Sequence, residues 1–344
     1  MLKAQADACA SYEGSQLLEG NLCATFYISI FIPHISKISS FLQSKKLKGM
    51  IRGAILVFLG ACSFGVLTTL VKISYKEGFT LAEVTGAQVF FGALILWLIL
   101  AGRALFQNIK FHFTWKNSWK VLLTGISTGL VSLCYYKSIQ ELPASIGILL
   151  LMQFTWISLL LEIIIHRKFP TRMQWVSVIF ILFGTYLAGN VYSLDNIPFS
   201  LEGIGYGFLA GFFYAVFIWA NGRVGNALIP VQKSAMMITG SCIFIFMIFP
   251  PEFLWNGSLS AGLWSWGLVF ALFGTVIPPL FYAYGIPQTG VGLSSILSSA
   301  ELPVAVFFSS WLLAEEVTAL QWVGVATILF AIVVANVKKA KKEV

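Results

Sequence analysis

Residues 282–303 read YAYGIPQTGVGLSSILSSAELP, and an apolar run from Val304 to Leu313 follows. Glu301 therefore lies far inside a segment long enough to cross a bilayer, at a depth of roughly 18 Å for a rise of about 1.5 Å per residue. A charge at that depth costs on the order of 2.5–3.5 kcal/mol, so it normally faces a cavity, a partner or a proton. The stretch predicts a membrane helix organised around one acidic side chain.

The composition is that of a polytopic membrane protein. The chain has 344 residues, of which 58% are hydrophobic and 10% are charged, and its mean hydropathy is +0.85. A soluble domain carries about 25% charged residues. The net charge of +8 resides in short connections and tails, which indicates membrane orientation and not a nucleic-acid-binding face.

Apolar runs predict an all-α fold with ten transmembrane helices. The runs are interrupted by short polar connections, none of which is long enough to form a second soluble domain. The expected ranges are approximately 51–72, 80–101, 119–139, 144–165, 172–190, 201–221, 232–250, 263–285, 289–314 and 318–337.

Basic residues set the predicted orientation. The connections after the second, fourth and sixth spans, and both tails, hold most of the Lys and Arg residues, whereas the alternate connections hold mostly Asp and Glu. Cytoplasmic loops are enriched in Lys and Arg. We therefore expect both termini to be cytoplasmic and the protein to be integral to the cytoplasmic (inner) membrane.

Residues 1–49 differ from the rest of the chain. They are polar apart from the apolar patch 22–32, which is too short to span a bilayer. The patch is expected to be an interfacial helix or a signal-like apolar region. The whole extension is expected to be a cytoplasmic segment without stable structure, with translation that starts at Met50 as the alternative. The expected organisation is this extension, a first five-helix repeat over 50–190, and a second over 191–344 that ends in a basic cytoplasmic tail.

The two halves resemble one another. With one residue of slack in the 166–172 loop, Gln153 aligns with Glu301, and Gln174-Trp175 aligns with Gln321-Trp322. Because five spans per half is odd, the second half enters the membrane from the opposite side. This is an inverted repeat, the architecture that supports alternating access to a site at mid-membrane. Duplication without transport, or chance similarity of apolar runs, is the alternative.

These residues carry a resemblance to a known family. Glu301-Leu-Pro303-Val304, Glu316 and Gln321-Trp322-Val-Gly324 resemble the EamA-type branch of the drug/metabolite transporter superfamily, as does Phe64-Gly65 with Lys72. The resemblance covers 51–337 and implies ten helices, a central substrate cavity and transport of small metabolites. The segment 153–156 departs from it, because the commoner family pattern has a proline there.

Depth and repeat position select the candidate substrate-binding residues. Glu301 is expected to bind a substrate amine or a proton, and its alternative role is to fix helix packing through a hydrogen bond. Gln153 is expected either to complete the site or to bond between helices. Aromatic rings suit a flat or cationic solute, or they form core. The remaining candidates are Ser298, Tyr135, Tyr214, Tyr282, Trp156 and Trp219.

Three other features have competing interpretations. Lys72, at the outer end of the first span, is expected to extend to the membrane surface or to attract anions. Glu162 and His166 are four residues apart and are expected to pair on one helix face. Pro278-Pro279 interrupts the eighth span and predicts a bend.

The leading hypothesis for function is a secondary transporter of a small organic metabolite, such as an amino acid, that works by alternating access with or without proton coupling. The alternatives are efflux of cationic or aromatic drug-like compounds, and a non-transporting membrane receptor or scaffold. An enzyme is not expected, because the acid/base pairs and ligand clusters of intramembrane catalysis are missing from the sequence. We expect no cofactor, no metal site and no nucleic-acid partner, and the expected partners are a small-molecule substrate, protons and membrane lipid.

Overall fold

The computed structural model describes residues 45–107, 115–142, 144–191 and 200–342. The chain divides into two units, Met1–Gly49 and Met50–Val344. The second unit contains all of the apolar ranges expected to span the membrane. The expectations for residues 1–44 lie outside the described residues.

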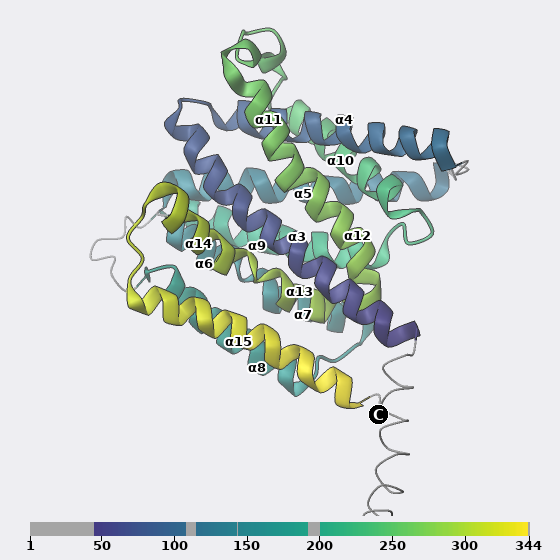
Figure 1. The fold of residues 1–344 in the computed structure, drawn as a ribbon, viewed down its shortest axis with the longest axis vertical. Helices are drawn as coiled ribbons and strands as arrows, with labels where there is room; N and C mark the ends of the chain where they lie inside the picture. Colours follow the sequence, from purple (N-terminus) through teal and green to yellow (C-terminus); the bar gives the residue numbers. More distant parts are fainter. Residues whose placement is uncertain (1–44, 108–114, 143, 192–199, 343–344) are drawn as a thin grey trace, which may run out of the picture. The chain divides into compact units, whose positions relative to one another are not determined.

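The described residues form helices joined by short connections (Figure 1). The longer helices are α3 (Lys45–Lys76), α4 (Leu81–Gln107), α5 (Trp115–Glu141), α8 (Arg172–Ala188), α9 (Leu201–Arg223), α10 (Pro230–Ile248) and α15 (Ala319–Lys342). The interrupted helices are α6 (Ala144–Leu151) with α7 (Phe154–His166), α13 (Val291–Ser298) with α14 (Glu301–Leu313), and α11 (Trp264–Phe270) with α12 (Ile277–Thr289). The short segments are η2 (Glu252–Leu254), η3 (Leu259–Leu263) and η4 (Ala271–Val276).

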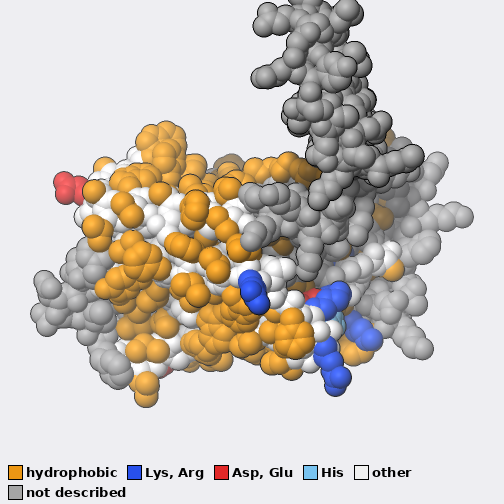
Figure 2. Space-filling view, turned by 90° about the horizontal axis from the view of Figure 1, so that it is seen from below, with side chains coloured by type: hydrophobic (Ala, Val, Ile, Leu, Met, Phe, Trp, Pro, Cys, Tyr) orange, Lys and Arg blue, Asp and Glu red, His pale blue; other side chains and the backbone are white. Residues whose placement is uncertain are grey.

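Seven helical segments among the described residues are long and apolar enough to cross a membrane. They are Leu47–Lys76, Leu81–Phe106, Ile146–His166, Leu201–Arg223, Pro230–Ile248, Leu259–Thr289 and Val291–Leu313, and Arg172–Ala188 and Ala319–Ala335 are shorter apolar helices. Large apolar side chains such as Leu98, Ile179 and Trp311 are exposed. Figure 2 shows one face that is mostly hydrophobic, with a small group of Lys and Arg side chains in one part of it. Such apolar surface is suited to contact with lipid.

Two helices are interrupted in the same way. Met152-Gln153 separates α6 from α7, and Ser299-Ala300 separates α13 from α14. Each pair consists of 8 residues followed by 13 residues. Each ends at a left-handed residue that is not glycine, Arg167 and Ala314, both with φ of 52°.

The helices that follow the two interrupted pairs, α8 and α15, also begin in the same way. At the start of α8, Thr171 and Gln174 form a capping box in which each side chain bonds to the backbone N–H of the other residue. Thr318 and Gln321 make the same two bonds at the start of α15, at 2.9 and 3.3 Å. The sequence repeats Gln-Trp at these two helix starts. The glutamine of each pair is explained by the capping box, because glutamine is favoured three residues after the N-cap.

The helix bounds shift the expected repeat register by one residue. A single shift of 147 residues, from Phe154 to Glu301, relates both interrupted helices and the capping boxes. No slack is therefore needed in the 166–172 loop. Phe154, instead of Gln153, occupies the position that corresponds to Glu301.

Helices α8 and α15 contact each other closely and lie side by side in Figure 1. Their contacts are related by the same shift of 147 residues. The Ser177 hydroxyl donates to the Ala331 carbonyl at 3.0 Å. A Cβ atom added to Gly184 would lie 2.8 Å from the Gly324 carbonyl oxygen. The shift carries Ser177 to Gly324 and Gly184 to Ala331, so the two contacts exchange places, as in a two-fold interface.

The eighth predicted span is irregular where the sequence indicated. Pro278 and Pro279 lie in the first turn of α12, and the wider π-helical turn η4 precedes them. Proline is tolerated in a first turn because its missing N–H has no partner there in any case. The irregularity therefore lies in η4, directly before the two prolines, and π-helical turns of this kind are frequent at functional sites.

Candidate functional site

A cavity of about 270 Å³ lies among α3, α4, α5 and α9. Its lining on α3 runs from Phe64 to Tyr75, and on α5 from Thr128 to Ile139, so it occupies one half of the length of these helices. Lys72 lines its outer part and Glu301 lines its inner part. We name the two ends of the molecule after basic residues: the cavity lies toward the Lys72 end, and the Arg223 end is the opposite one.

Glu301 lies at the base of the cavity as the first residue of α14. The Tyr214 hydroxyl donates a hydrogen bond to its Oε2 atom at 3.1 Å. Gly65 lets α3 approach closely, because a Cβ atom there would lie 2.5 Å from the Glu301 carbonyl oxygen. A carboxylate in the first turn of a helix is favoured by the helix dipole, so the interruption before α14 helps to hold this acid at mid-depth.

Aromatic rings close the base of the cavity. Phe154 packs on Tyr214 with ring centroids 4.4 Å apart, and Phe217 packs on Tyr282 at 5.8 Å. The four rings are nearly inaccessible to solvent. The hydroxyl groups of Tyr214 and Tyr282 are 3.3 Å apart. Tyr214 and Phe217 line the cavity, whereas Phe154 and Tyr282 are buried and are not among its lining residues.

The structure brings together some of the residues expected from the sequence. Glu301, Tyr135 and Tyr214 line the cavity. Tyr282 is fully buried behind Tyr214. The Ser298 hydroxyl donates to the Ser294 carbonyl at 2.9 Å, one turn back in α13.

Three other expected residues lie away from this cavity. The Trp156 indole donates to the Gln153 Oε1 atom at 2.7 Å, and the Gln153 amide donates to the Leu149 carbonyl at 2.9 Å. Trp219 packs beside His166, with ring centroids 6.0 Å apart. None of Gln153, Trp156 and Trp219 is among the described residues that line the cavity. The polar groups of Gln153 are therefore used locally, at the interruption before α7.

Polar residues that the sequence reasoning missed also line the cavity. Gln88 on α4, and Thr128 and Ser132 on α5, contribute amide and hydroxyl groups, and Tyr75 adds a phenol. A polar residue inside an apolar run was the available signal, since such residues usually face a cavity or a partner. The run alone does not give the rotation of the helix, which decides whether the residue faces the cavity.

An ion pair stands at the Lys72 end. The Lys72 Nζ atom lies 3.5 Å from Glu315 Oε1, in the connection between α14 and α15. Ser309 also donates a hydrogen bond to Glu315. Lys72 lines both the central cavity and a second hollow bounded by α8, α14 and α15. Lys72 thus has an acidic partner in the other half of the chain, and its expected extension to the membrane surface stays a prediction.

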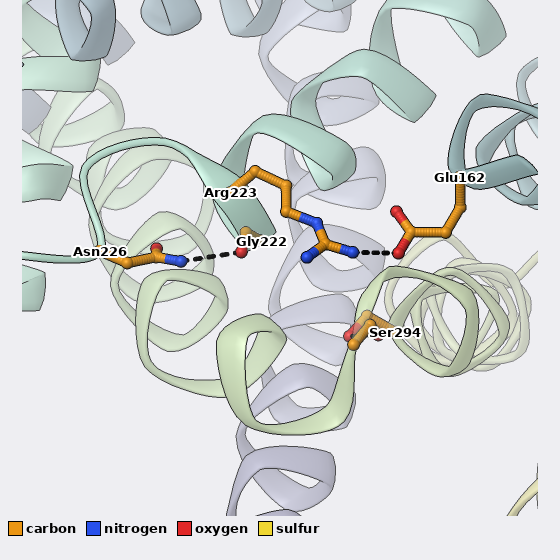
Figure 3. Close-up of polar contacts among 6 residues, drawn as sticks. Glu162, Gly222, Arg223, Asn226 and Ser294 are labelled. Carbon is orange, nitrogen blue, oxygen red and sulfur yellow. Dashed lines mark hydrogen bonds and ion pairs between the residues drawn. The ribbon is translucent and has the colours of Figure 1, made fainter. Parts of the chain in front are cut away.

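A second ion pair stands at the Arg223 end (Figure 3). The Arg223 guanidinium, at the end of α9, donates to Glu162 Oε1 on α7. The expected pairing of Glu162 with His166 is therefore wrong, because α9 supplies a permanent cation. Asn226 donates to the Gly222 carbonyl at 2.8 Å beside this pair. Both members of the ion pair line a cavity of about 840 Å³ at this end.

The buried Lys233 secures the same region. Its Nζ atom donates to the Asn221 carbonyl at 2.6 Å and to Asn226 Oδ1 at 2.9 Å. The side chain is 1% exposed, so the charge is compensated by the carbonyl groups at the end of α9. Among the described residues, no group of three His, Cys, Asp or Glu side chains could hold a metal ion.

The site therefore combines three features: apolar helices around a central cavity, interrupted helices beside it and an acidic side chain in its lining. Together they are typical of a helical membrane transporter. Comparison with known proteins agrees. The chain belongs to the EamA-like transporter family, whose model matches residues 51–190 and 201–337. It is therefore an integral membrane protein of a class that binds small-molecule substrates.

Individual relatives are distant. The threonine/homoserine exporter RhtA of Escherichia coli (strain K12) is 26% identical over 257 residues, which are 72% of this chain and 79% of that protein. The uncharacterized transporter YcbK of Bacillus subtilis (strain 168) is 21% identical, over 87% of this chain and 97% of that protein. One crystal structure matches the fold with a TM-score of 0.66 at 13% identity, over 83% of this chain and 97% of the other.

Proposed function

We propose that this protein is a secondary transporter that exports a small amine-bearing solute, such as an amino acid, by alternating access. One observation carries the proposal. Among the described residues, Glu301 is the only acidic side chain that lines the central cavity, and Tyr214 holds its carboxyl group in place at 3.1 Å. A carboxylate held in a site of low polarity is the natural counter-charge of an ammonium group.

The size of the cavity favours a small solute. Its volume is about 270 Å³, whereas sites for drug-sized ligands are roughly 300–1,000 Å³. The similarity to a threonine/homoserine exporter supports the same size class and the outward direction. Lys72 also lines the cavity, where its ammonium group is paired with Glu315 at 3.5 Å.

We further propose ten transmembrane helices in two inverted five-helix repeats. The family model matches once in each half, and one shift of 147 residues relates the interrupted helices. Because Lys and Arg are enriched on the cytoplasmic side, the Arg223 end and both termini are cytoplasmic. The Lys72 end then faces outward from the cytoplasmic membrane.

Proton coupling through Glu301 is part of the proposal. A carboxyl group shielded from water takes up a proton more readily than an exposed one. A proton and a substrate ammonium group would then compete for the same oxygen atoms, which links export to the inward movement of a proton.

Counterflow in liposomes tests the proposal. Purified protein is screened against amino acids and amines by thermal shift, and each stabilising solute is then assayed for exchange at several pH values. We expect Glu301→Gln to lower exchange by about tenfold or more, the scale of a lost bond to a charged group, and to remove its pH dependence. Glu202→Gln, an exposed acid at the start of α9, is the matched control.

The outcomes separate the alternatives. Full exchange with unchanged pH dependence in Glu301→Gln would remove Glu301 from binding and coupling. Solutes that stabilise the protein but never exchange would favour a receptor or scaffold.

Efflux of flat cations is the second candidate. It is favoured by the aromatic rings that line the cavity, which can bind a cation through their faces; these are Phe64, Tyr75, Tyr135, Tyr136, Tyr214 and Phe217. Aromatic cations in the thermal-shift panel distinguish it, because a small-solute transporter will neither bind nor exchange them.

A further inference from the structure

Two buried polar atoms belong to residues that line the central cavity, and neither has a hydrogen-bond partner among the described residues. They are Gln88 Oε1 and Thr128 Oγ1. Gln88 is 4% exposed and Thr128 is 9% exposed. The Tyr75 hydroxyl, also on the cavity wall, is likewise unpartnered within the described part of the chain. Leaving a buried polar group unpaired costs about 1–3 kcal/mol. Three such residues line one cavity, one each on α3, α4 and α5, which favours a ligand that supplies the missing partners.

Gln88 lies at nearly the same depth as Glu301 but on another side of α3. A Cβ atom on Gly65 would touch the Glu301 backbone, whereas a Cβ atom on Gly274 would lie 2.5 Å from Gln88 Nε2 and 2.7 Å from Leu67 Cδ2. Gly65 and Leu67 are two residues apart, which on a helix is about 3 Å of rise and roughly 200° of rotation. The Glu301 backbone and the Gln88 amide therefore lie near opposite faces of α3.

The position of Gln88 is fixed by the irregular segment η4. The Thr275 hydroxyl donates to the Gln88 carbonyl at 3.0 Å, and the side-chain amide rests against Gly274. Any side chain at position 274 would displace this amide. The π-helical turn before Pro278 thus has a specific consequence, because it places a small residue and a hydroxyl group against Gln88.

The chemistry of this wall differs from that of Glu301. An amide and two hydroxyl groups are neutral, and each can donate and accept hydrogen bonds. They suit a group that also does both, such as a hydroxyl or an amide, and they do not compensate a charge. A site built to bond a substrate hydroxyl discriminates against the analogue that lacks it, because its own polar groups are then left unpaired.

We infer that Gln88 and Thr128, with Tyr75, form a neutral polar subsite that binds a hydroxyl or amide group of the solute whose ammonium group binds Glu301. This inference rests on the proposed function and narrows the substrate class to small polar amino acids and amino alcohols. Gln88 and Thr128 determine specificity, whereas Glu301 holds the shared amine.

Matched solutes test the subsite. L-threonine and L-valine differ by one hydroxyl in place of a methyl group, as do L-homoserine and L-norvaline. Each pair is compared by counterflow in liposomes with wild type, Thr128→Val and Gln88→Met. The matched control is Thr185→Val, since Thr185 is also buried but donates to the Ile181 carbonyl of its own helix at 2.7 Å.

We expect wild type to prefer the hydroxylated member of at least one pair by about tenfold. Each cavity variant is expected to reduce that preference at least threefold while exchange of the apolar member is retained, and Thr185→Val is expected to keep the wild-type ratio. Two variants on different helices guard against a folding defect in either one.

The failures are distinguishable. If wild type exchanges both members of every pair equally, or if both cavity variants keep the wild-type preference, the subsite is overturned while transport stands. If no amine-bearing solute exchanges at all, the proposed function fails and the subsite fails with it.

Discussion

Tyr214 is the residue on which the geometry of Glu301 depends. Its hydroxyl bonds to the Glu301 carboxylate, and its ring is fixed between Phe154 and Phe64, with centroid distances of 4.4 and 6.1 Å. The hydroxyl of Tyr282 lies 3.3 Å from that of Tyr214 and so meets the acid only through its neighbour. The two tyrosines are therefore a natural pair for comparison.

We expect Tyr214→Phe to raise KM for exchange by roughly tenfold, because a hydrogen bond to a charged group contributes about 1.5–3 kcal/mol. Tyr282→Phe keeps the aromatic packing and leaves the bond to Glu301 intact, so its effect is expected to be below about threefold. Initial rates of counterflow at varied solute concentration measure both. Equal effects of the two variants would show that ring packing, and not the bond to Glu301, matters.

The sequence predicts how far along a span a residue lies, but not which way its side chain points. It placed Glu301, Tyr135 and Tyr214 at the right level because level follows from position along an apolar run. It missed Gln88 and Thr128, which line the same cavity, because the rotation of a helix in an apolar solvent leaves little periodicity to read.

Small residues at helix crossings decide how closely the helices pack, and Gly125 is the clearest case. A Cβ atom there would lie 1.8 Å from the Met237 carbonyl oxygen, so α5 and α10 are in backbone contact. On α10, a Cβ atom added to Gly240 would lie 2.0 Å from the Leu122 carbonyl oxygen. Small residues are the usual means by which membrane helices approach one another.

Gly125→Ala is expected to lower Tm in detergent by roughly 5 °C or more, since overpacking a tight contact costs about 1–3 kcal/mol. Gly205→Ala is the control, because no heavy atom lies within 4 Å of the added Cβ atom and alanine favours helix. Thermal unfolding followed by a thiol-reactive dye or by scanning fluorimetry compares the two. A Tm for Gly125→Ala that matches Gly205→Ala would contradict the close crossing of α5 and α10.

The helices themselves were the most predictable part of the molecule. The all-helical fold was expected, and seven segments among the described residues are long and apolar enough to cross a membrane, because length and hydropathy are strong signals. The interruptions before Phe154 and Glu301 were not predicted. Neither interruption contains a glycine, and no proline comes directly before either one. Their equivalence emerges only from the helix bounds, which also moved the partner of Glu301 from Gln153 to Phe154.

At the scale of the whole molecule, the two ion pairs follow one plan. At each end, a basic residue near the end of a long helix, Lys72 on α3 or Arg223 on α9, binds an acid from the other half of the chain. The Lys72 pair is more exposed, with side chains 35% and 47% accessible, and pairs of this kind contribute about 0–1 kcal/mol. The Arg223 pair is more buried, at 31% and 10%, so breaking it costs more.

If the ends open alternately, the two pairs oppose each other. Removing one pair favours the state that is open at that end, and a change of about 1.4 kcal/mol shifts the ratio of the two states tenfold. We therefore expect Glu162→Gln to favour opening at the Arg223 end and Glu315→Gln to favour opening at the Lys72 end.

Cysteine accessibility measures this shift. In a background without the native cysteines, Leu293→Cys reports on the Arg223 end and Leu67→Cys on the central cavity, since both leucines are buried residues that line those spaces. Glu162→Gln is expected to speed maleimide labelling at position 293 severalfold and to slow it at position 67, and Glu315→Gln is expected to do the reverse. Exchanging the charges, Glu162→Arg with Arg223→Glu, should restore the original rates if the ion pair itself holds the end closed. Labelling that rises at both positions in either variant would mean general loosening, and the two pairs would then be structural ties with no part in alternation.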